Sequence, residues 1–205
     1  ADGTGAAHLY GDADHCDGGA DYPVWSPDGT RLALVCYLLE GAHGVATIAV
    51  LDLATMERRE IVRLAWPEMT DNPPAWSPDG STIAFDIITW DPTDTKVTSM
   101  LVATVPAEGG EIRRLTDPAL YAAHPDWSPD GRLIAFNTYD TGNIHGIEQP
   151  SNVYTIAPDG TGLRQLSTAS TDGKMRLGQP FWSSDGTRIW VSIGRDWEKD
   201  STGQY

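Results

Sequence analysis

Short apolar segments recur along the chain, each beside a tight turn. The first two surround residues 26–29, Ser-Pro-Asp-Gly, where Pro and Gly stand at the second and fourth positions of a type I turn. Apolar residues flank this turn on both sides, which predicts a hairpin with one arm at Trp25 and the other at residues 31–34. Residues 46–51 supply a third apolar strand, and a fourth strand ends at Leu64. No segment keeps a 3.6-residue apolar period for three turns without Gly or Pro, so we expect an all-β fold.

The same arrangement occurs four times. Four Trp residues, spaced 51, 51 and 55 positions apart, each begin the sequence Trp-Ser-Pro-Asp-Gly or Trp-Ser-Ser-Asp-Gly: Trp25, Trp76, Trp127 and Trp182. A Leu follows 39 positions after each of the first three. Four antiparallel strands in each unit of about 50 residues predict the blades of a β-propeller. The predicted units lie within one domain, residues 1–205, at about 23–69, 74–119, 125–170 and 180–205.

The first ten residues match the end of a blade. Leu9 precedes Trp25 by 16 positions, as Leu166 precedes Trp182, so residues 1–10 are predicted to form an outer strand of a neighbouring or closing blade. The fourth unit has only its first two strands before the sequence stops. Either the N-terminal strand closes a four-bladed ring, or the four units are part of a larger propeller, completed by its remainder or by another copy. We favour the larger propeller, because the sequence starts and stops inside a blade.

The repeated sequence Trp-Ser-Pro-Asp-Gly-x-x-Ile-Ala-Phe, followed by an Asp-Gly turn and Arg-Leu-Thr, resembles the TolB-type, WD-like propeller repeat. The resemblance covers essentially the whole chain and implies a propeller fold. Similar repeats occur in TolB, in propeller domains of prolyl-oligopeptidase-like hydrolases and in some polysaccharide lyases. It therefore does not select one function. Because the similar proteins are mostly periplasmic or secreted, the resemblance implies a location outside the cytoplasm.

Composition narrows the range of partners. Fourteen basic residues against 29 acidic ones give a formal net charge of −15, which would repel nucleic acid and would favour a basic partner surface. No apolar run reaches the length of a membrane-spanning helix, so no membrane span is expected. The chain has three Lys and eleven Arg to hold a polyanion, which argues against a lyase acting on acidic polysaccharide.

One position has a different residue in each of the four repeats, although the sequence that follows it is repeated. It lies three residues before each Trp, where the inner strand should begin near the central channel. In propellers of the resembled kind the channel mouth is a frequent ligand or peptide site. We therefore predict that the binding residues are Tyr22, Pro73, His124 and Gln179. The alternative for His124 is a surface imidazole that merely precedes Pro125.

An acidic loop and two cysteines leave alternatives open. The loop carries Asp12, Asp14, Asp17 and Asp21. Ca²⁺ prefers oxygen ligands, which suggests a weak calcium site, but Asp17 falls one position late for the usual calcium loop, so a solvated acidic loop is the alternative. No other cofactor is expected. Cys16 and Cys36 either form a disulfide or leave Cys36 as a small buried apolar side chain.

The sequence lacks the motifs of common enzymes. It has no Gly-x-Ser-x-Gly, no His-Glu-x-x-His and no Gly-x-x-x-x-Gly-Lys. We interpret the repeated Trp residues as packing blade against blade, and the repeated Asp residues as bonding the backbone of their turns. We therefore expect a non-catalytic scaffold that binds a protein or peptide. The alternatives are the propeller domain of a larger secreted prolyl-oligopeptidase-like hydrolase and, less favoured, a polysaccharide lyase.

Overall fold

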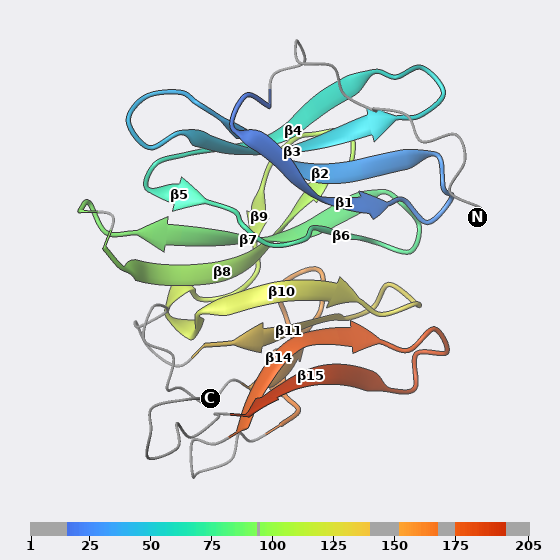
Figure 1. Cartoon of the computed structure of the whole chain (residues 1–205). Coiled ribbons are helices and arrows are strands. Elements are labelled where there is room, and N and C mark those ends of the chain that lie inside the picture. The colour runs from blue at the N-terminus through green and yellow to red at the C-terminus, as the bar shows by residue number, and fades with distance from the viewer. Residues whose placement is uncertain (1–15, 94, 140–151, 168–174, 196–205) are drawn as a thin grey trace, which may run out of the picture.

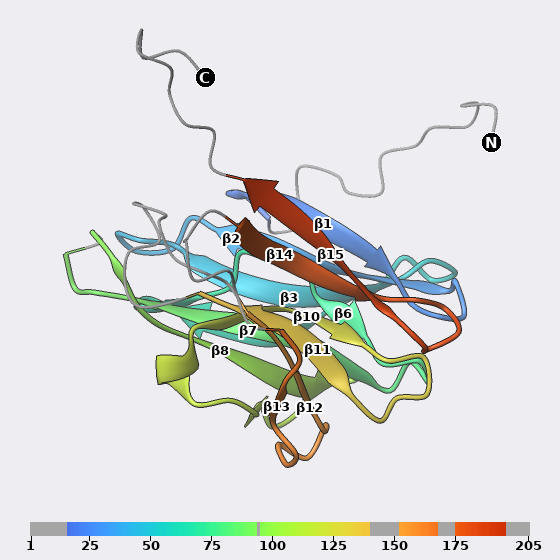
Figure 2. The same ribbon diagram turned by 90° about the horizontal axis from the view of Figure 1, so that it is seen from below.

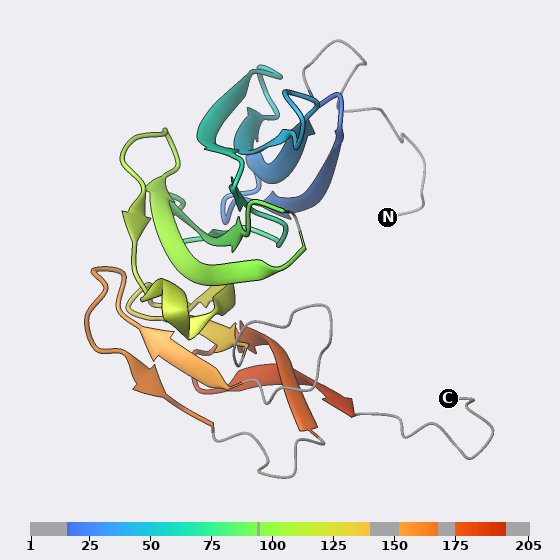
Figure 3. The ribbon, with the colours of Figure 1, turned by 90° about the vertical axis from the view of Figure 1, so that its left-hand side faces the viewer.

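The computed structural model describes residues 16–93, 95–139, 152–167 and 175–195. They form four antiparallel sheets arranged as a fan (Figures 1 and 3). The first sheet is a meander whose strands follow one another in space as in sequence: β1 (Gly19–Trp25), β2 (Arg31–Leu38), β3 (Val45–Asp52) and β4 (Arg58–Ala65).

The next two sheets repeat this meander. In the second sheet the inner strand is split in two, and its strands are β5 (Glu68–Met69), β6 (Ala75–Trp76), β7 (Thr82–Trp90), β8 (Val97–Pro106) and β9 (Arg113–Arg114). A short 3₁₀ helix, η1 (Pro118–Leu120), leads into the third sheet, which contains β10 (Ala122–Trp127), β11 (Ile134–Thr138), β12 (Val153–Ile156) and β13 (Arg164–Gln165).

The fourth sheet consists, in the described residues, of β14 (Met175–Trp182) and β15 (Ile189–Arg195). β14 lies against β10 and β11 of the third sheet (Figure 2). The all-β class and the repeated antiparallel sheet are thus confirmed. The described residues do not by themselves form a closed ring. The strand predicted for residues 1–10 lies outside the described residues. No helix in the described ranges has the length and apolar character needed to cross a membrane.

The turn between the first two strands of each sheet is held by its own Ser and Asp side chains. The Ser26 hydroxyl donates to Asp28 Oδ1 (2.6 Å), and the Thr30 N–H donates to the same oxygen (3.0 Å). The Arg31 N–H donates to Ser26 Oγ (2.9 Å), which closes the turn from the other side. The same Ser-to-Asp bond recurs in the other three sheets at 2.6, 2.7 and 2.6 Å. The structural interpretation of the repeated Asp residues is therefore confirmed.

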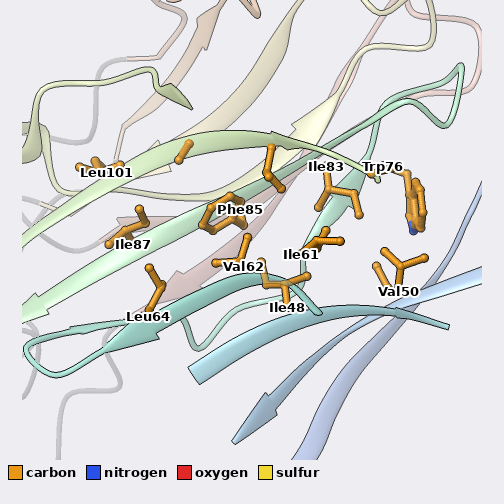
Figure 4. Close-up of a cluster of buried hydrophobic side chains, with 14 residues drawn as sticks. Ile48, Val50, Ile61, Val62, Leu64, Trp76, Ile83, Phe85, Ile87 and Leu101 are labelled. Carbon is orange, nitrogen blue, oxygen red and sulfur yellow. The ribbon is translucent and has the colours of Figure 1, made fainter. Parts of the chain in front are cut away.

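Alternate residues of a strand pack in two different interfaces, one with the preceding sheet and one with the following sheet. We call the face of a sheet that packs on the preceding sheet its front face, and the opposite one its back face. On β7, Phe85 and Ile87 belong to the front face and pack with Ile48 and Val62 of the first sheet (Figure 4). Ala84 belongs to the back face and lies in the cluster shared with the third sheet. This alternation follows from the two-residue period of a strand.

Two of the four repeated Trp residues are buried in these interfaces. Trp76 and Trp127 are buried, and the Trp76 indole N–H donates to the carbonyl oxygen of Val24 in the preceding sheet (3.1 Å). The packing interpretation is confirmed for both. Trp25 differs, because 60% of its surface is exposed. In the first sheet, Cys36 of β2 forms a disulfide with Cys16, with 5.3 Å between their Cα atoms, so the disulfide alternative is the one found.

The turn carboxylates predict how stability depends on pH. The Ser26 hydroxyl, followed by the Thr30 N–H, lowers the pKa of Asp28 from 3.8 to about 2. A carboxylate with a lowered folded-state pKa contributes stability above its unfolded pKa and loses it as pH falls through the folded pKa. We therefore expect Asp28→Ala to lower the melting temperature at pH 6, and this difference to shrink between about pH 4 and pH 2.

Thermal melts followed by circular dichroism over that range measure this difference. Glu111→Ala, which removes an exposed carboxylate elsewhere, is the control. A difference between Asp28→Ala and the parent that stayed constant down to pH 2 would contradict the role assigned to the carboxylate.

Candidate functional site

The inner strand of each sheet is irregular at the same place. The pairing register shifts at residues 22–23 of β1, 124–125 of β10 and 178–179 of β14. In the second sheet the interruption is longer and separates β5 from β6 by residues 70–74. Such bulges redirect side chains and are enriched near functional sites. The four predicted binding residues all lie in these stretches: Tyr22, Pro73, His124 and Gln179. Their binding role stays a prediction.

Two of the four have an unusual backbone conformation. Tyr22 has a φ of 56° and His124 a φ of 53°, in the left-handed region that non-glycine residues seldom adopt. Such a conformation persists only where the surroundings impose it. The contacts that surround His124 show how this is done.

A buried carboxylate holds the bulge of the third sheet. Asp86, on β7, is 1% exposed. Its Oδ2 accepts from Asn72 Nδ2 (2.6 Å) and from the backbone N–H of His124 (3.4 Å), and its Oδ1 accepts from Thr70 Oγ1 (3.3 Å). Burial raises the pKa of this carboxyl, while the His124 ring and these donors oppose the rise. Asp86 therefore joins the 70–74 loop of the second sheet to the inner strand of the third.

The imidazole of His124 is held as well. Its Nδ1 lies 2.9 Å from Oδ1 of Asn137, a fully buried residue of β11. Because an amide oxygen only accepts hydrogen bonds, the proton of this contact is placed on Nδ1. The ring of Tyr139 lies beside the imidazole, with 6.2 Å between centroids and a tilt of 54°. We call Asn72, Asp86, His124, Asn137 and Tyr139 the polar cluster.

A second polar contact links the first and second sheets. The Tyr37 hydroxyl donates to Asp71 Oδ1 (2.6 Å). Burial, and next this bond, raise the pKa of Tyr37. The charge of Asp71, then burial, and then the charges of Asp21 and Asp86 raise the pKa of Tyr22. The surroundings of Tyr22 are thus negative and aromatic.

A group of aromatic rings adjoins the polar cluster through Tyr139. The rings of His43 and Trp66 stack at 4.2 Å, and Trp66 lies 6.5 Å from Trp90 at an angle of 24°. Trp90 packs in one apolar cluster with Tyr121 and Tyr139. Flat apolar faces next to fixed amide, carboxyl and imidazole groups are suited to recognition, because they combine buried area with directional bonds.

The calcium hypothesis gains no support from the described residues. Asp17 accepts the backbone N–H of Leu39 (2.8 Å), and Asp21 is exposed at the bulge of β1. Asp12 and Asp14 lie outside the described residues. Within those residues, no three His, Cys, Asp or Glu side chains are grouped as a metal site requires.

The sequence marked the variable position before each Trp, but neither the bulges at that position nor the residues that hold them were predicted. Asp86 and Asn137 both stand ten positions after their Trp, where the other two repeats have Val35 and Ser192. A buried polar residue inside an apolar strand is costly unless it is hydrogen-bonded. The sequence feature that could have revealed Asp86 and Asn137 is therefore the presence of a polar residue inside an apolar run, directly after Phe85 and Phe136.

The family model described as the TolB beta propeller domain matches residues 21–200. The chain belongs to the TolB beta-propeller family. A relative, the uncharacterized peptidase YuxL of Bacillus subtilis strain 168, is 32% identical over 114 residues, which are 55% of this chain and 16% of that protein. The TolB-family chain therefore spans about a sixth of the length of this relative.

Solved structures share the fold. TolB from Acinetobacter baumannii superposes with a TM-score of 0.59 at 18% identity, over 86% of this chain and 41% of that one. An oligogalacturonate lyase in complex with manganese superposes with a TM-score of 0.63 at 19% identity, over 87% of this chain and 47% of that one. At these identities the likeness concerns the TolB-type fold alone.

The contacts of Asp86 predict a large effect of its removal. Asp86→Val introduces the residue that the first sheet has at this place, but it leaves the Asn72 amide, the Thr70 hydroxyl and the His124 N–H without their acceptor. We expect the free energy of unfolding to fall by about 3 kcal/mol, measured by urea denaturation.

Ser192→Val, at the corresponding exposed place in the fourth sheet, is the matched control and should change the free energy of unfolding by less than about 0.5 kcal/mol. An Asp86→Val protein as stable as the parent would show that the carboxylate does not hold the bulge.

Proposed function

We propose that this TolB-type propeller is a non-catalytic scaffold that binds a protein or peptide at the bulges of its inner strands. The observation that carries the proposal is the polar cluster, which fixes the His124 bulge through groups from two adjacent sheets. A binding site gains affinity when its groups are already held in place, because less freedom is lost on binding. Tyr22, Pro73 and Gln179 occupy the corresponding places in the other sheets and would widen the contact surface.

The contacts of His124 support binding rather than catalysis. In the part of the chain that the structure describes, its ring is bonded to an amide and its backbone to a carboxylate, and no Ser, Thr or Cys hydroxyl or thiol is bonded to it. A nucleophilic mechanism needs a nucleophile within reach of its base. We propose that binding requires no cofactor, and a weak calcium site near Asp17 and Asp21 remains a separate hypothesis.

We further propose that the protein works in the periplasm or outside the cell. The Cys16–Cys36 disulfide supports this, because such bonds persist in oxidising compartments. The net charge of −15 and the carboxylates around Tyr22 favour a partner with a basic surface.

A second candidate function is the propeller domain of a larger secreted hydrolase of the prolyl-oligopeptidase kind. The similarity to the peptidase YuxL supports it. The intact mass of the polypeptide in its source, with both termini read, tests this alternative. A mass above 22.2 kDa with a Gly-x-Ser-x-Gly segment after Tyr205 would favour the hydrolase. A polysaccharide lyase is less favoured, since an acidic protein would repel a polyanionic substrate.

Peptide selection tests the binding proposal. Peptides selected from a random library on the immobilised 205-residue chain are measured by calorimetry against the parent and His124→Asn. Asn tolerates the left-handed backbone of position 124, so the variant removes the imidazole without adding backbone strain. We expect the affinity to fall about tenfold or more, as the loss of one well-placed hydrogen bond predicts.

Arg132→Ala changes an exposed side chain just after the Ser128–Asp130 turn and is the control, expected to leave the affinity unchanged. If every selected peptide bound His124→Asn as tightly as the parent, binding at the polar cluster would be ruled out.

A further inference from the structure

A cavity of about 460 Å³ lies between the first and second sheets, beside the β3–β4 turn. Its lining comes from the start of β2, from residues 50–59 around that turn, and from the loop that follows β8. Its apolar part is formed by Val50 and Ala107, which also belong to the core between the two sheets. Figure 4 shows Val50 and Trp76 at the same end of this core. The lining shares no residue with the polar cluster, so the cavity is a separate site.

One guanidinium group of the cavity is held in place by the second sheet. Arg31 lies over the Trp76 ring, with 4.8 Å between the guanidinium carbon and the ring centroid. Its Nη2 donates to the carbonyl oxygen of Gly80 (2.9 Å), and its side chain is 20% exposed. These contacts occupy one face of the guanidinium and one of its nitrogens. The second terminal nitrogen, Nη1, is thereby positioned to donate to an acceptor in the cavity.

A carboxylate of the chain itself occupies this position. Arg31 Nη1 donates to Glu108 Oε1 (3.2 Å), and Arg59 Nη1 donates to Glu108 Oε2. The two guanidiniums are thus spaced to hold both oxygens of one carboxyl group. The Glu108 and Arg59 side chains are 68% and 59% exposed, and exposed ion pairs contribute little to stability. A carboxylate from outside can therefore replace that of Glu108 at small cost.

The other charges of the cavity favour a ligand with one negative charge. Asp52 and Glu57 line it, and Asp52 is bonded by two backbone N–H groups of its own turn. Arg58 lines it as well, and its Nη2 donates to Cys36 Sγ (3.3 Å). Once Glu108 is displaced, three guanidiniums stand against two carboxylates, a balance of +1. This balance suits a monoanion better than a polyanion.

The repeat does not require the two guanidiniums that hold Glu108. Arg31 stands six positions after its Trp, where the second sheet has Thr82. Arg59 stands five positions before its Leu, where the second sheet has Gly110. The corresponding place between the second and third sheets therefore lacks both guanidiniums, although these sheets pack together in the same way. The pair is an addition to the repeat rather than a condition for packing adjacent sheets.

We propose that this cavity binds an organic monocarboxylate with a small apolar body. The carboxylate of the ligand takes the place of Glu108 between Arg31 and Arg59, and the apolar body lies against Val50 and Ala107. A free acid and the C-terminal carboxylate of a chain share this chemistry. Because Glu108 competes for the two guanidiniums, the parent binds such a ligand more weakly than the vacated cavity would. The proposal does not depend on binding at the polar cluster.

Two probes distinguish the two sources of the ligand. 4-Methylpentanoate represents a free acid, and N-acetyl-L-leucine represents the C-terminus of a chain. Binding to the ¹⁵N-labelled 205-residue chain is followed by amide chemical shifts in nuclear magnetic resonance, and the tighter of the two acids indicates the source. N-acetyl-L-leucinamide keeps the apolar body without the charge and is the matched control ligand. We expect the amide to bind at least about tenfold more weakly than the corresponding acid.

Two variants make the same test on the protein side. Glu108→Ala removes the competing carboxylate and should raise the affinity for either acid about tenfold. Arg59→Ala removes one of the two guanidiniums and should lower the affinity about tenfold. Glu111→Ala and Arg113→Ala remove exposed charges of the same signs nearby, and as matched controls they should stay within about twofold of the parent. Circular dichroism verifies that each variant is folded.

Three results would overturn the proposal. Equal affinity of the parent and Glu108→Ala for both acids would show that Glu108 does not occupy the place of a ligand. Equal affinity for the acid and its amide would show that the guanidiniums take no part in binding. If neither acid shifted the amides of Val50, Arg59 and Ala107 in Glu108→Ala up to about 50 mM, the charged side chains would only join the two sheets.

Discussion

The register between the first two strands of each sheet is the constraint on which the rest of the structure depends. The Ser and Asp of the turn fix it by bonding both to each other and to the backbone on the far side. Since side chains alternate between the two faces of a strand, a slip of one residue would exchange the front and back faces of every sheet. The turn therefore decides that Phe85 packs on the preceding sheet and that Ala84 meets the following one.

The same register places the functional candidates. A polar residue ten positions after the Trp must lie on the back face, between its own sheet and the next. Asp86 uses this place to reach the bulge of the third sheet, and Asn137 uses it to hold the His124 imidazole within its own sheet. Polar groups are costly at such buried places, and the bonds that Asp86 accepts and the bond between His124 and Asn137 offset part of that cost. The site is thus a local modification of an interface that is otherwise apolar.

Much of this fold could be predicted from the sequence because the repeated turn carries its own geometry. The Trp spacing and the Ser-Pro-Asp-Gly turns predicted the strands and the all-β class. The variable position before each Trp marked Tyr22 and His124, which lie where the strand register shifts, and their binding role stays a prediction. The bonds between sheets could not be predicted, because they join residues that are distant in sequence, such as Asp86 and His124. The bulges were also out of reach, since a register shift depends on both strands of a pair. Neither Asn72 nor Tyr37 belongs to a repeated motif, so nothing in the sequence marked them.

The central claim is that a peptide or protein segment binds at the bulge held by Asp86 and His124. Amide chemical shifts, measured by nuclear magnetic resonance while a selected peptide is added to the ¹⁵N-labelled chain, test it most directly. The account predicts that the largest changes occur at residues 70–74 of the second sheet and at Ala122–Trp127 of the third. Changes confined to the outer strands β4, β9 and β13, with none at the bulge, would contradict it.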